Sequence, residues 1–205
     1  MNVLITGGTG LIGRALTRSL LADGHKVWIL TRAPARVTLP LGCAALGWDG
    51  RTAQGWGELV NEMDAVVNLA GVNTASWPWT PARKQSFWNS RVWAGQAVAE
   101  AVRLAKKKPA VLIQSSGINH YGLRGKTADE STPSADDFLA RLTVAWEFSS
   151  QPVEELGVRR VVICNLDGLR AGGGTSNGNT VPAGGLIVAC SATGHGTFAP
   201  GVDGQ

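Results

Sequence analysis

The sequence predicts an α/β fold in which helices cover both faces of a doubly wound parallel sheet. Short apolar runs alternate with segments of helical period along residues 1–163, which is typical of β-α-β units joined by right-handed crossovers. A glycine-rich turn, Thr6-Gly7-Gly8-Thr9-Gly10-Leu11-Ile12-Gly13, follows the first apolar run. Strand, glycine turn and helix in that order indicate the first unit of a dinucleotide-binding Rossmann fold.

The three glycines at the spacing G-x-x-G-x-x-G have separate expected roles. Gly7 allows the sharp bend, Gly10 lets the backbone approach a pyrophosphate, and Gly13 lets the helix lie close to the strand. The positive end of the helix dipole then faces the phosphates. The alternative is a purely structural glycine turn. The residues expected to contact a dinucleotide here are Gly7, Thr9, Gly10, Leu11, Ile12 and Gly13.

The first helix is expected to bury Leu11, Ile12, Ala15, Leu16 and Leu20 on one face and to close at Gly24. A second strand, 27–30, follows, and its end decides which cofactor fits. An acid about 20 residues past the glycines suits NAD, whereas an arginine suits the 2′-phosphate of NADP. This sequence has Thr31 and Arg32 there, with Arg36 nearby. Because a guanidinium pairs bidentately with phosphate, we predict NADP(H); the alternative is a surface arginine on a loop.

The next elements end in small or polar residues that suit a ligand site. Residues 33–63 are rich in loops, with one short strand at 44–46, and a buried strand at 64–71 ends in Leu69-Ala70-Gly71. Open α/β sheets bind ligands at the carboxyl ends of their strands, so we expect this end to contact the cofactor. The same pattern also fits tight packing without a ligand.

A long crossover helix is predicted to start at Thr80-Pro81, an N-cap and first-turn pair, and to end before Lys106-Lys107-Lys108. Arg91 lies near its sheet-facing side, where a lone arginine needs an anion, so we assign it to the cofactor. Trp77 and Trp79 precede the helix and either cover the site or anchor their loop.

Hydroxyl groups follow the next strand, which is expected at 110–114. We expect Ser115 to contact the cofactor and Ser116 and Tyr121 to line the substrate pocket. The alternative for Tyr121 is a packed ring with a hydrogen-bonded hydroxyl. A helix at 138–149 and a strand at 158–163 complete the predicted sheet.

Composition excludes several other classes of function. The net charge is +4, but the basic residues are scattered, and the lysine run suits a helix C-terminus better than nucleic acid. The cysteines lack C-x-x-C spacing and the histidines stand alone, so no metal site is expected. With no leader and no apolar run of spanning length, we expect a cytoplasmic protein without membrane contact.

Together these residues resemble the extended short-chain dehydrogenase/reductases, and more narrowly their atypical, epimerase-like branch within the NAD-dependent epimerase/dehydratase superfamily. The resemblance covers about residues 1–163 and also includes Tyr121-Gly122 and Trp146-Glu147. It implies NADP contacts at the glycine turn, Thr31-Arg32, Leu69-Ala70 and Ser90-Arg91. It also implies a small-molecule substrate such as a nucleotide-linked compound, and a homodimer by analogy with the superfamily.

The sequence departs from that family where catalysis is expected. The family uses a Tyr-x-x-x-Lys pair and a Ser or Thr on the preceding strand, and these positions fall on Leu139, Thr143 and Gly117. None of these can supply a titratable group, so no catalytic residue is assigned. Two hypotheses follow: an NADP(H)-dependent oxidoreductase or isomerase, or a non-catalytic NADP(H)-binding redox sensor or regulator, for example of cell division.

The C-terminal segment also departs from the family, whose members continue into a substrate-binding portion. Residues 171–205 are rich in Gly, Ser and Thr without any period, as expected for an irregular tail. The sequence therefore predicts a Rossmann domain at 1–170 and a tail at 171–205. We therefore expect the substrate-binding portion to be largely missing, through a truncated or frame-shifted C-terminus.

Overall fold

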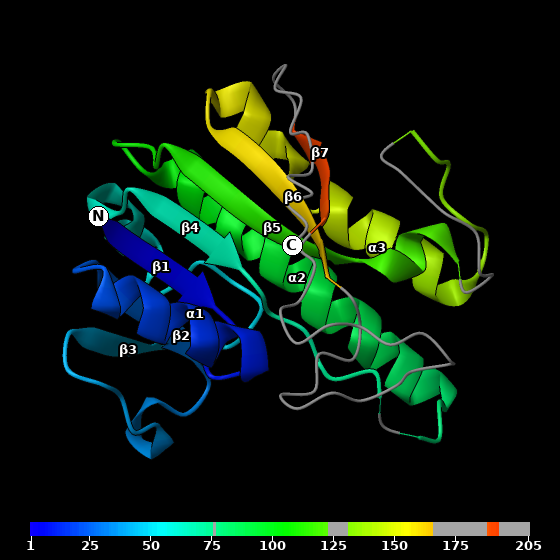
Figure 1. The fold of residues 1–205 in the computed structure, drawn as a ribbon, viewed down its shortest axis with the longest axis horizontal. Helices are drawn as coiled ribbons and strands as arrows, with labels where there is room; N and C mark the ends of the chain where they lie inside the picture. Colours follow the sequence, from blue (N-terminus) through cyan, green and yellow to red (C-terminus); the bar gives the residue numbers. More distant parts are fainter. Residues whose placement is uncertain (76, 123–130, 166–187, 193–205) are drawn as a thin grey trace, which may run out of the picture.

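The fold is built on one sheet whose strands run mostly parallel. A computed structural model describes residues 1–75, 77–122, 131–165 and 188–192. These residues form a seven-stranded sheet in the order β3-β2-β1-β4-β5-β6-β7 (Figure 1). The first six strands are parallel: β1 (Asn2–Thr6), β2 (Lys26–Thr31), β3 (Cys43–Gly47), β4 (Ala65–Asn68), β5 (Val111–Gly117) and β6 (Arg159–Asn165).

The chain winds outward in both directions from the centre of the sheet. From β1 it proceeds to β2 and β3 on one side, and then crosses to β4, β5 and β6 on the other. The carboxyl ends of β1 and β4 therefore flank the switch point of the topology, where open α/β sheets hold their ligands. This order confirms the predicted doubly wound parallel sheet.

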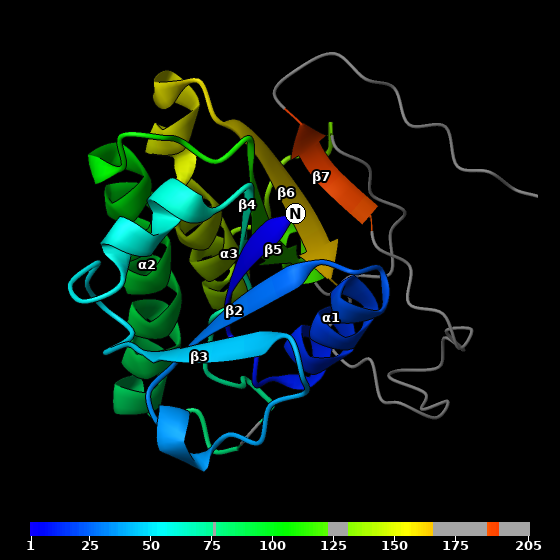
Figure 2. The same ribbon diagram turned by 90° about the vertical axis from the view of Figure 1, so that its left-hand side faces the viewer.

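Helices cover both faces of the sheet. Figure 2 shows α1 (Leu11–Ala22) on one face, and α2 (Pro81–Leu104) and α3 (Phe138–Phe148) on the other. Side chains of β1 alternate between the two faces, so Val3 and Ile5 belong to the core under α1 while Leu4 belongs to the core under α2. Four short 3₁₀ segments lie between the larger elements: η1 (Pro34–Arg36), η2 (Gly57–Glu62), η3 (Ile118–Tyr121) and η4 (Gln151–Leu156).

The buried face of α1 differs from the prediction. Leu16 and Leu20 pack against the sheet as expected, but Leu11 is 61% exposed and Ile12 is 38% exposed. Gly13 and Thr17 are buried instead. The reason is that the first turn of α1 lies so close to the backbone of Gly7 and Gly8 that no side chain larger than that of Gly13 fits beneath it. The first two apolar residues consequently face outward.

The ends of α2 agree with the sequence analysis. Thr80 is the N-cap, and its Oγ1 accepts a hydrogen bond from the backbone N–H of Arg83 at 3.3 Å. Beyond the last turn, Lys108 donates from Nζ to the carbonyl oxygens of Arg103 and Ala105. The lysine run therefore contributes a cation to carbonyl groups that the helix leaves unpaired.

A strand that the sequence did not predict lies at the edge of the sheet. β7 (Val188–Ala192) pairs antiparallel with β6, inside the segment 171–205 that was expected to be irregular. Backbone pairing of an edge strand depends little on side-chain period, so composition did not reveal it. The other residues of that segment lie outside the described ranges, and the domain division at residue 170 stays a prediction.

Two features are absent from the described residues, a membrane-spanning helix and a cluster of metal ligands. Within these ranges, no helix combines the length and apolar character needed to cross a membrane. The same residues contain no group of three or more His, Cys, Asp or Glu side chains placed to hold a metal ion.

Candidate functional site

Two adjoining cavities open beside the carboxyl ends of β1 and β4. The first has a volume of about 600 Å³ and extends toward β2, β3 and α2, whereas the second has about 820 Å³ and extends toward β5 and α3. Both are lined by Gly7, Gly10, Leu69 and Gly71. The glycine turn and the end of β4 therefore lie between two compartments, an arrangement that suits a two-part ligand.

The glycine turn is shaped by close backbone contacts on two sides and by open space on the third. Gly7 has a φ of +69°, and a Cβ there would lie 2.6 Å from the Leu69 carbonyl oxygen. A Cβ on Gly13 would lie 2.5 Å from the carbonyl oxygen of Gly7. At Gly10, apart from its neighbours in the chain and its own helix, the described residues offer one contact within 4 Å, that same Gly7 oxygen at 3.2 Å. Gly7 and Gly13 thus permit packing, while Gly10 leaves room in the cavities.

The N-terminus of α1 has no side-chain cap. Gly10 is its N-cap residue, and Thr9 precedes it in the wall of the first cavity. Leu11, Ile12 and Gly13, which begin the helix, line the second cavity. Because the first N–H groups of a helix have no partner within the helix, an anion in these cavities could accept hydrogen bonds from them.

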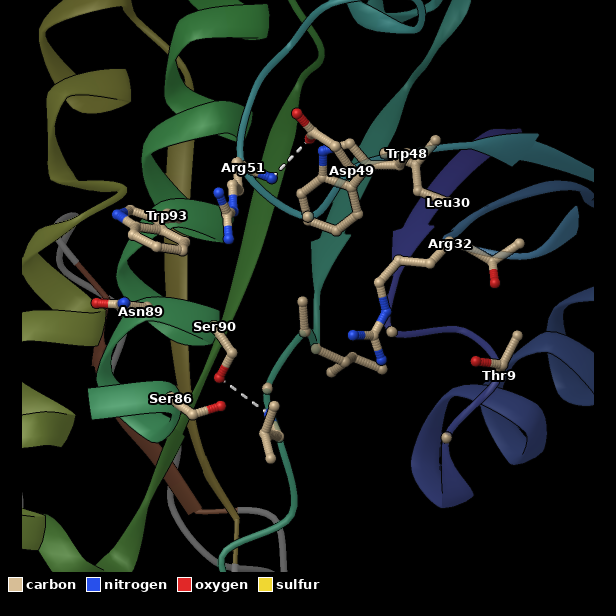
Figure 3. Close-up of a pocket in the computed structure, with 18 of the residues that line it drawn as sticks. Thr9, Leu30, Arg32, Trp48, Asp49, Arg51, Ser86, Asn89, Ser90 and Trp93 are labelled. Atoms are coloured by element: carbon tan, nitrogen blue, oxygen red, sulfur yellow. Dashed lines mark hydrogen bonds between the residues drawn. The ribbon is translucent and has the colours of Figure 1, made fainter. Parts of the chain in front are cut away.

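The first cavity collects polar side chains from three elements, as Figure 3 shows. Thr31 and Arg32 enter from the end of β2, and Trp48 and Asp49 from the end of β3. Arg36, in η1, is absent from the described residues that line this cavity. From α2 come Ser90, which the family resemblance implied, and Ser86, Asn89 and Trp93, which sequence reasoning missed.

A buried hydrogen-bond network joins the ends of β1 and β4 to the middle of β5. Thr6 donates from Oγ1 to Oδ1 of Asn68 at 2.5 Å, and Asn68 donates from Nδ2 to Oε1 of Gln114 at 2.9 Å. Gln114 donates onward to the carbonyl oxygen of Ser115 at 2.7 Å. Sequence reasoning did not identify this network, although polar residues in three buried strands were a usable signal.

Thr6 and Asn68 also hold the segment that follows β4. The backbone N–H of Ala70 lies 3.3 Å from Oγ1 of Thr6 and 3.4 Å from Oδ1 of Asn68. Leu69 and Gly71 lie on either side of it and line both cavities, as Ala70 lines the first. The strand end assigned to the cofactor is therefore fixed in place by the buried network.

Arg91 contacts carbonyl groups where the sequence analysis expected an anion. Its Nη1 donates to the carbonyl oxygen of Val72 at 3.0 Å and to that of Phe87 at 3.3 Å. Its guanidinium carbon lies 4.9 Å from the ring centre of Trp146. The neighbouring Ser90 accepts a hydrogen bond from the backbone N–H of Val72. The pair thus holds the loop after Gly71, and Arg91 still lines the second cavity.

The second cavity contains the positions at which the family resemblance located the catalytic groups. Gly117 of β5 and Leu139 and Thr143 of α3 all line it. The Thr143 hydroxyl donates to the carbonyl oxygen of Leu139 at 2.6 Å. The chain therefore presents a glycine, an apolar side chain and a hydroxyl bonded to its own helix where the family has acid and base groups.

Ser115 and Ser116 both line the second cavity, and Ser116 belongs to a polar cluster. Ser116 donates from Oγ to Oε1 of Glu147, and Nδ1 of His120 lies 3.5 Å from the same oxygen. Tyr121 lines neither cavity, and its ring packs edge-on against His120 with centres 4.9 Å apart. The structure thus brings Ser116 to the candidate substrate pocket without Tyr121, because the turn η3 directs that ring against its neighbour.

The two tryptophans before α2 behave differently. Trp79 donates from Nε1 to the carbonyl oxygen of Thr74 and packs edge-on against Phe87, and it also lines the second cavity. Trp77 is 81% exposed. Trp79 therefore both anchors its loop and covers part of the site, which combines the two alternatives that the sequence left open.

Comparisons with known proteins agree with this geometry. The sequence model of the NAD dependent epimerase/dehydratase family matches residues 3–141. Epimerase family protein Mb2239 of Mycobacterium bovis is 37% identical over 162 residues, which cover 78% of this chain and 51% of the relative. Epimerase family protein YfhF of Bacillus subtilis is 36% identical, with coverages of 78% and 53%. The chain thus spans about half the length of these curated relatives.

A solved structure is also similar. It is a crystal structure of the human epimerase family protein SDR39U1 with NADPH, at a TM-score of 0.62 and 30% identity. The similarity covers 79% of this chain and 52% of the human chain.

Proposed function

Because the chain belongs to the NAD dependent epimerase/dehydratase family, in its epimerase-like branch of the short-chain dehydrogenase/reductases, we propose that it binds NADP(H) across the glycine turn. The observation that carries this proposal is the pair of cavities that share Gly10, where a missing side chain leaves open space beside an uncapped helix N-terminus. Backbone N–H groups and the helix dipole suit a pyrophosphate there. The human relative that was crystallised with NADPH supports the same choice of ligand.

The two cavities would hold different halves of the dinucleotide. The adenosine half belongs to the first cavity, because Arg32 supplies a guanidinium there for a 2′-phosphate and the end of β2 supplies no carboxylate. The nicotinamide half belongs to the second cavity, where Ser115 and the hydroxyl of Ser116 lie. When bound, the cofactor supplies hydride transfer chemistry.

We further propose an oxidoreductase or isomerase activity on a small molecule such as a nucleotide-linked compound. Ser116 is the hydroxyl in the second cavity that contacts a carboxylate, that of Glu147. It could orient a substrate oxygen by a hydrogen bond, and Trp79 and Trp146 would exclude water from part of the cavity. The cytoplasmic location and the homodimer stay predictions.

A second candidate function is a non-catalytic NADP(H)-binding sensor or regulator. Leu139, Thr143 and Gly117 favour it, since no titratable side chain stands at the family's catalytic positions. Turnover of carbonyl compounds by the purified protein would support the enzyme. Association with a protein partner that requires NADPH, without turnover, would support the regulator.

A fluorescence titration with NADPH and, separately, NADH tests the binding proposal. The chain has eight tryptophans whose emission can transfer energy to a reduced nicotinamide. We expect saturable binding that is tighter for NADPH, and a loss of this preference in Arg32→Ala. If the protein is folded by circular dichroism and binds neither dinucleotide, the proposal is wrong.

A further inference from the structure

A second arginine lines the first cavity, in addition to the Arg32 that the sequence analysis assigned. Arg51 lies in the loop after β3, and both arginines are lining residues. Figure 3 shows the Arg32 side chain extending into the cavity from the β2 side and the Arg51 side chain entering from the side of α2. Two guanidinium groups therefore approach one space from different elements.

The loop that carries Arg51 is fixed by hydrogen bonds. Oδ1 of Asp49 accepts the backbone N–H of Arg51 at 2.7 Å and that of Thr52 at 2.9 Å, while Oδ2 accepts the Thr52 hydroxyl at 2.9 Å. The indole N–H groups of Trp48 and Trp56 both donate to the carbonyl oxygen of Thr52, at 2.9 and 2.8 Å. These bonds hold the backbone at residue 51 before any ligand arrives.

The side chain of Arg51 has a support of its own. Its guanidinium carbon lies 4.5 Å from the ring centre of Trp93, a residue of α2 that also lines the cavity. A guanidinium over an aromatic face keeps its N–H donors at its edge, where they can reach an anion. Among the described residues, no acceptor takes a hydrogen bond from this guanidinium.

Asp49 could in principle serve a different ligand, the 2′-hydroxyl of NAD. Of the described residues that line the first cavity, it is the one with a carboxylate. However, its oxygens already accept three hydrogen bonds from the turn. The backbone N–H groups of Thr52 and Arg51 lower the pKa of this carboxyl, so it stays ionised and committed to the turn.

We infer that Arg32 and Arg51 together form an anion site that binds the 2′-phosphate of NADP(H). The inference rests on the proposed function and deepens it by naming a second residue that selects the cofactor. Two guanidinium groups against one carboxylate leave the described lining with an excess of positive charge. A phosphate offers several charged oxygens that can accept bidentate hydrogen bonds from each guanidinium, whereas the ribose 2′-hydroxyl of NAD offers a single uncharged oxygen.

The test compares four variants by titration with NADPH and NADH, and by displacement of NADPH with 2′,5′-ADP and 5′-AMP. The variants are Arg51→Ala, Arg51→Lys, Arg32→Ala and, as the matched control, Arg36→Ala, which removes the same charge outside the cavity lining. For Arg51→Ala we expect a dissociation constant about tenfold higher for NADPH and for 2′,5′-ADP. The values for NADH and 5′-AMP should stay within about twofold. Arg51→Lys should fall between the wild type and Arg51→Ala.

Several outcomes would overturn the inference. If Arg51→Ala weakens NADPH and NADH equally, the residue contacts a part that both share. If Arg51→Ala changes neither the dissociation constant for NADPH nor that for NADH, Arg51 does not bind the phosphate. The same conclusion follows if Arg36→Ala weakens NADPH binding as much as Arg51→Ala does. A wild type that binds both dinucleotides equally overturns the inference while leaving dinucleotide binding intact. A folded wild type that binds neither contradicts the proposed function itself, and this inference with it.

Discussion

Ser116 on β5 donates a hydrogen bond from its Oγ to Oε1 of Glu147 on α3, and so joins the sheet to the helix that closes the second cavity. The hydroxyl is buried and the carboxyl group is partly buried. A hydrogen bond to a carboxylate in such a place contributes to stability as well as to the shape of the cavity. Mutation of either partner can measure what this hydrogen bond contributes to stability.

Replacing Ser116 by alanine should destabilise the protein by about 1 to 2 kcal/mol, because a partly buried carboxylate loses a donor. Glu147→Gln should lower the free energy of unfolding less, since the amide oxygen can still accept a hydrogen bond from the Ser116 hydroxyl. Urea unfolding followed by tryptophan fluorescence measures both. Ser86→Ala, which removes an exposed hydroxyl from α2, is the control. Equal stability of Ser116→Ala and the wild type would contradict the structural role.

The buried network gives a second prediction. Asn68→Ala should lower the free energy of unfolding by about 2 to 4 kcal/mol, because Thr6 and Gln114 would both lose a partner in the core. Asn89→Ala is a suitable comparison, since its amide oxygen accepts one exposed bond, from Gln85. We expect the comparison variant to unfold within about 0.5 kcal/mol of the wild type. Similar losses of unfolding free energy in Asn68→Ala and Asn89→Ala would mean that the buried network adds little to stability.

Periodicity and motif spacing predicted the main elements because each buries a regular apolar face. The six parallel strands, α2 with its Thr80 cap, and α3 all follow from such local signals. The handedness of the crossovers then sets the face of the sheet on which each connecting helix lies. The face of α1 was misjudged because the identity of the buried residues depends on how closely Gly13 packs against the backbone of Gly7 and Gly8, which the apolar period does not show.

The candidate site was predicted only in part, for a similar reason. The glycine turn, Arg32 and Ser116 can each be recognised from the few residues that surround them in the sequence. Arg51 reaches the first cavity from a loop, and Glu147 accepts the Ser116 hydroxyl from a helix, and both are distant in sequence from those signals. Tyr121 matched a motif, yet the direction of its ring was set by the short turn η3. The spacing of motif residues along the sequence does not predict where a side chain points in an irregular segment.

The Asp49 turn predicts a dependence of stability on pH. Backbone N–H groups of Thr52 and Arg51 hold the pKa of this carboxyl below its ordinary value of 3.8. Because the pKa is lower in the folded state than in the unfolded state, the ionised carboxyl stabilises the fold fully above the unfolded-state pKa. This stabilisation is lost as the pH falls through the folded-state pKa. The stability difference between the wild type and Asp49→Asn should therefore be constant from pH 5 to 8 and shrink below about pH 4. Urea unfolding across that range measures it, and a difference that grows in acid would contradict the turn's role.

The two glycines that begin α1 allow folding and ligand binding to be tested apart. Gly13→Ala would place a Cβ 2.5 Å from the Gly7 carbonyl oxygen, so we expect a loss of about 2 kcal/mol or more in stability. Gly10→Ala would meet only that oxygen, at 3.2 Å, and otherwise fill cavity space, so the fold should survive with a loss of about 1 kcal/mol or less. Its dissociation constant for NADPH should nevertheless rise at least about tenfold, because the methyl group occupies the place proposed for the pyrophosphate. Thermal unfolding measures the stability of both variants, and titration with NADPH measures their dissociation constants. Unchanged NADPH binding by a folded Gly10→Ala protein would place the dinucleotide somewhere other than this turn.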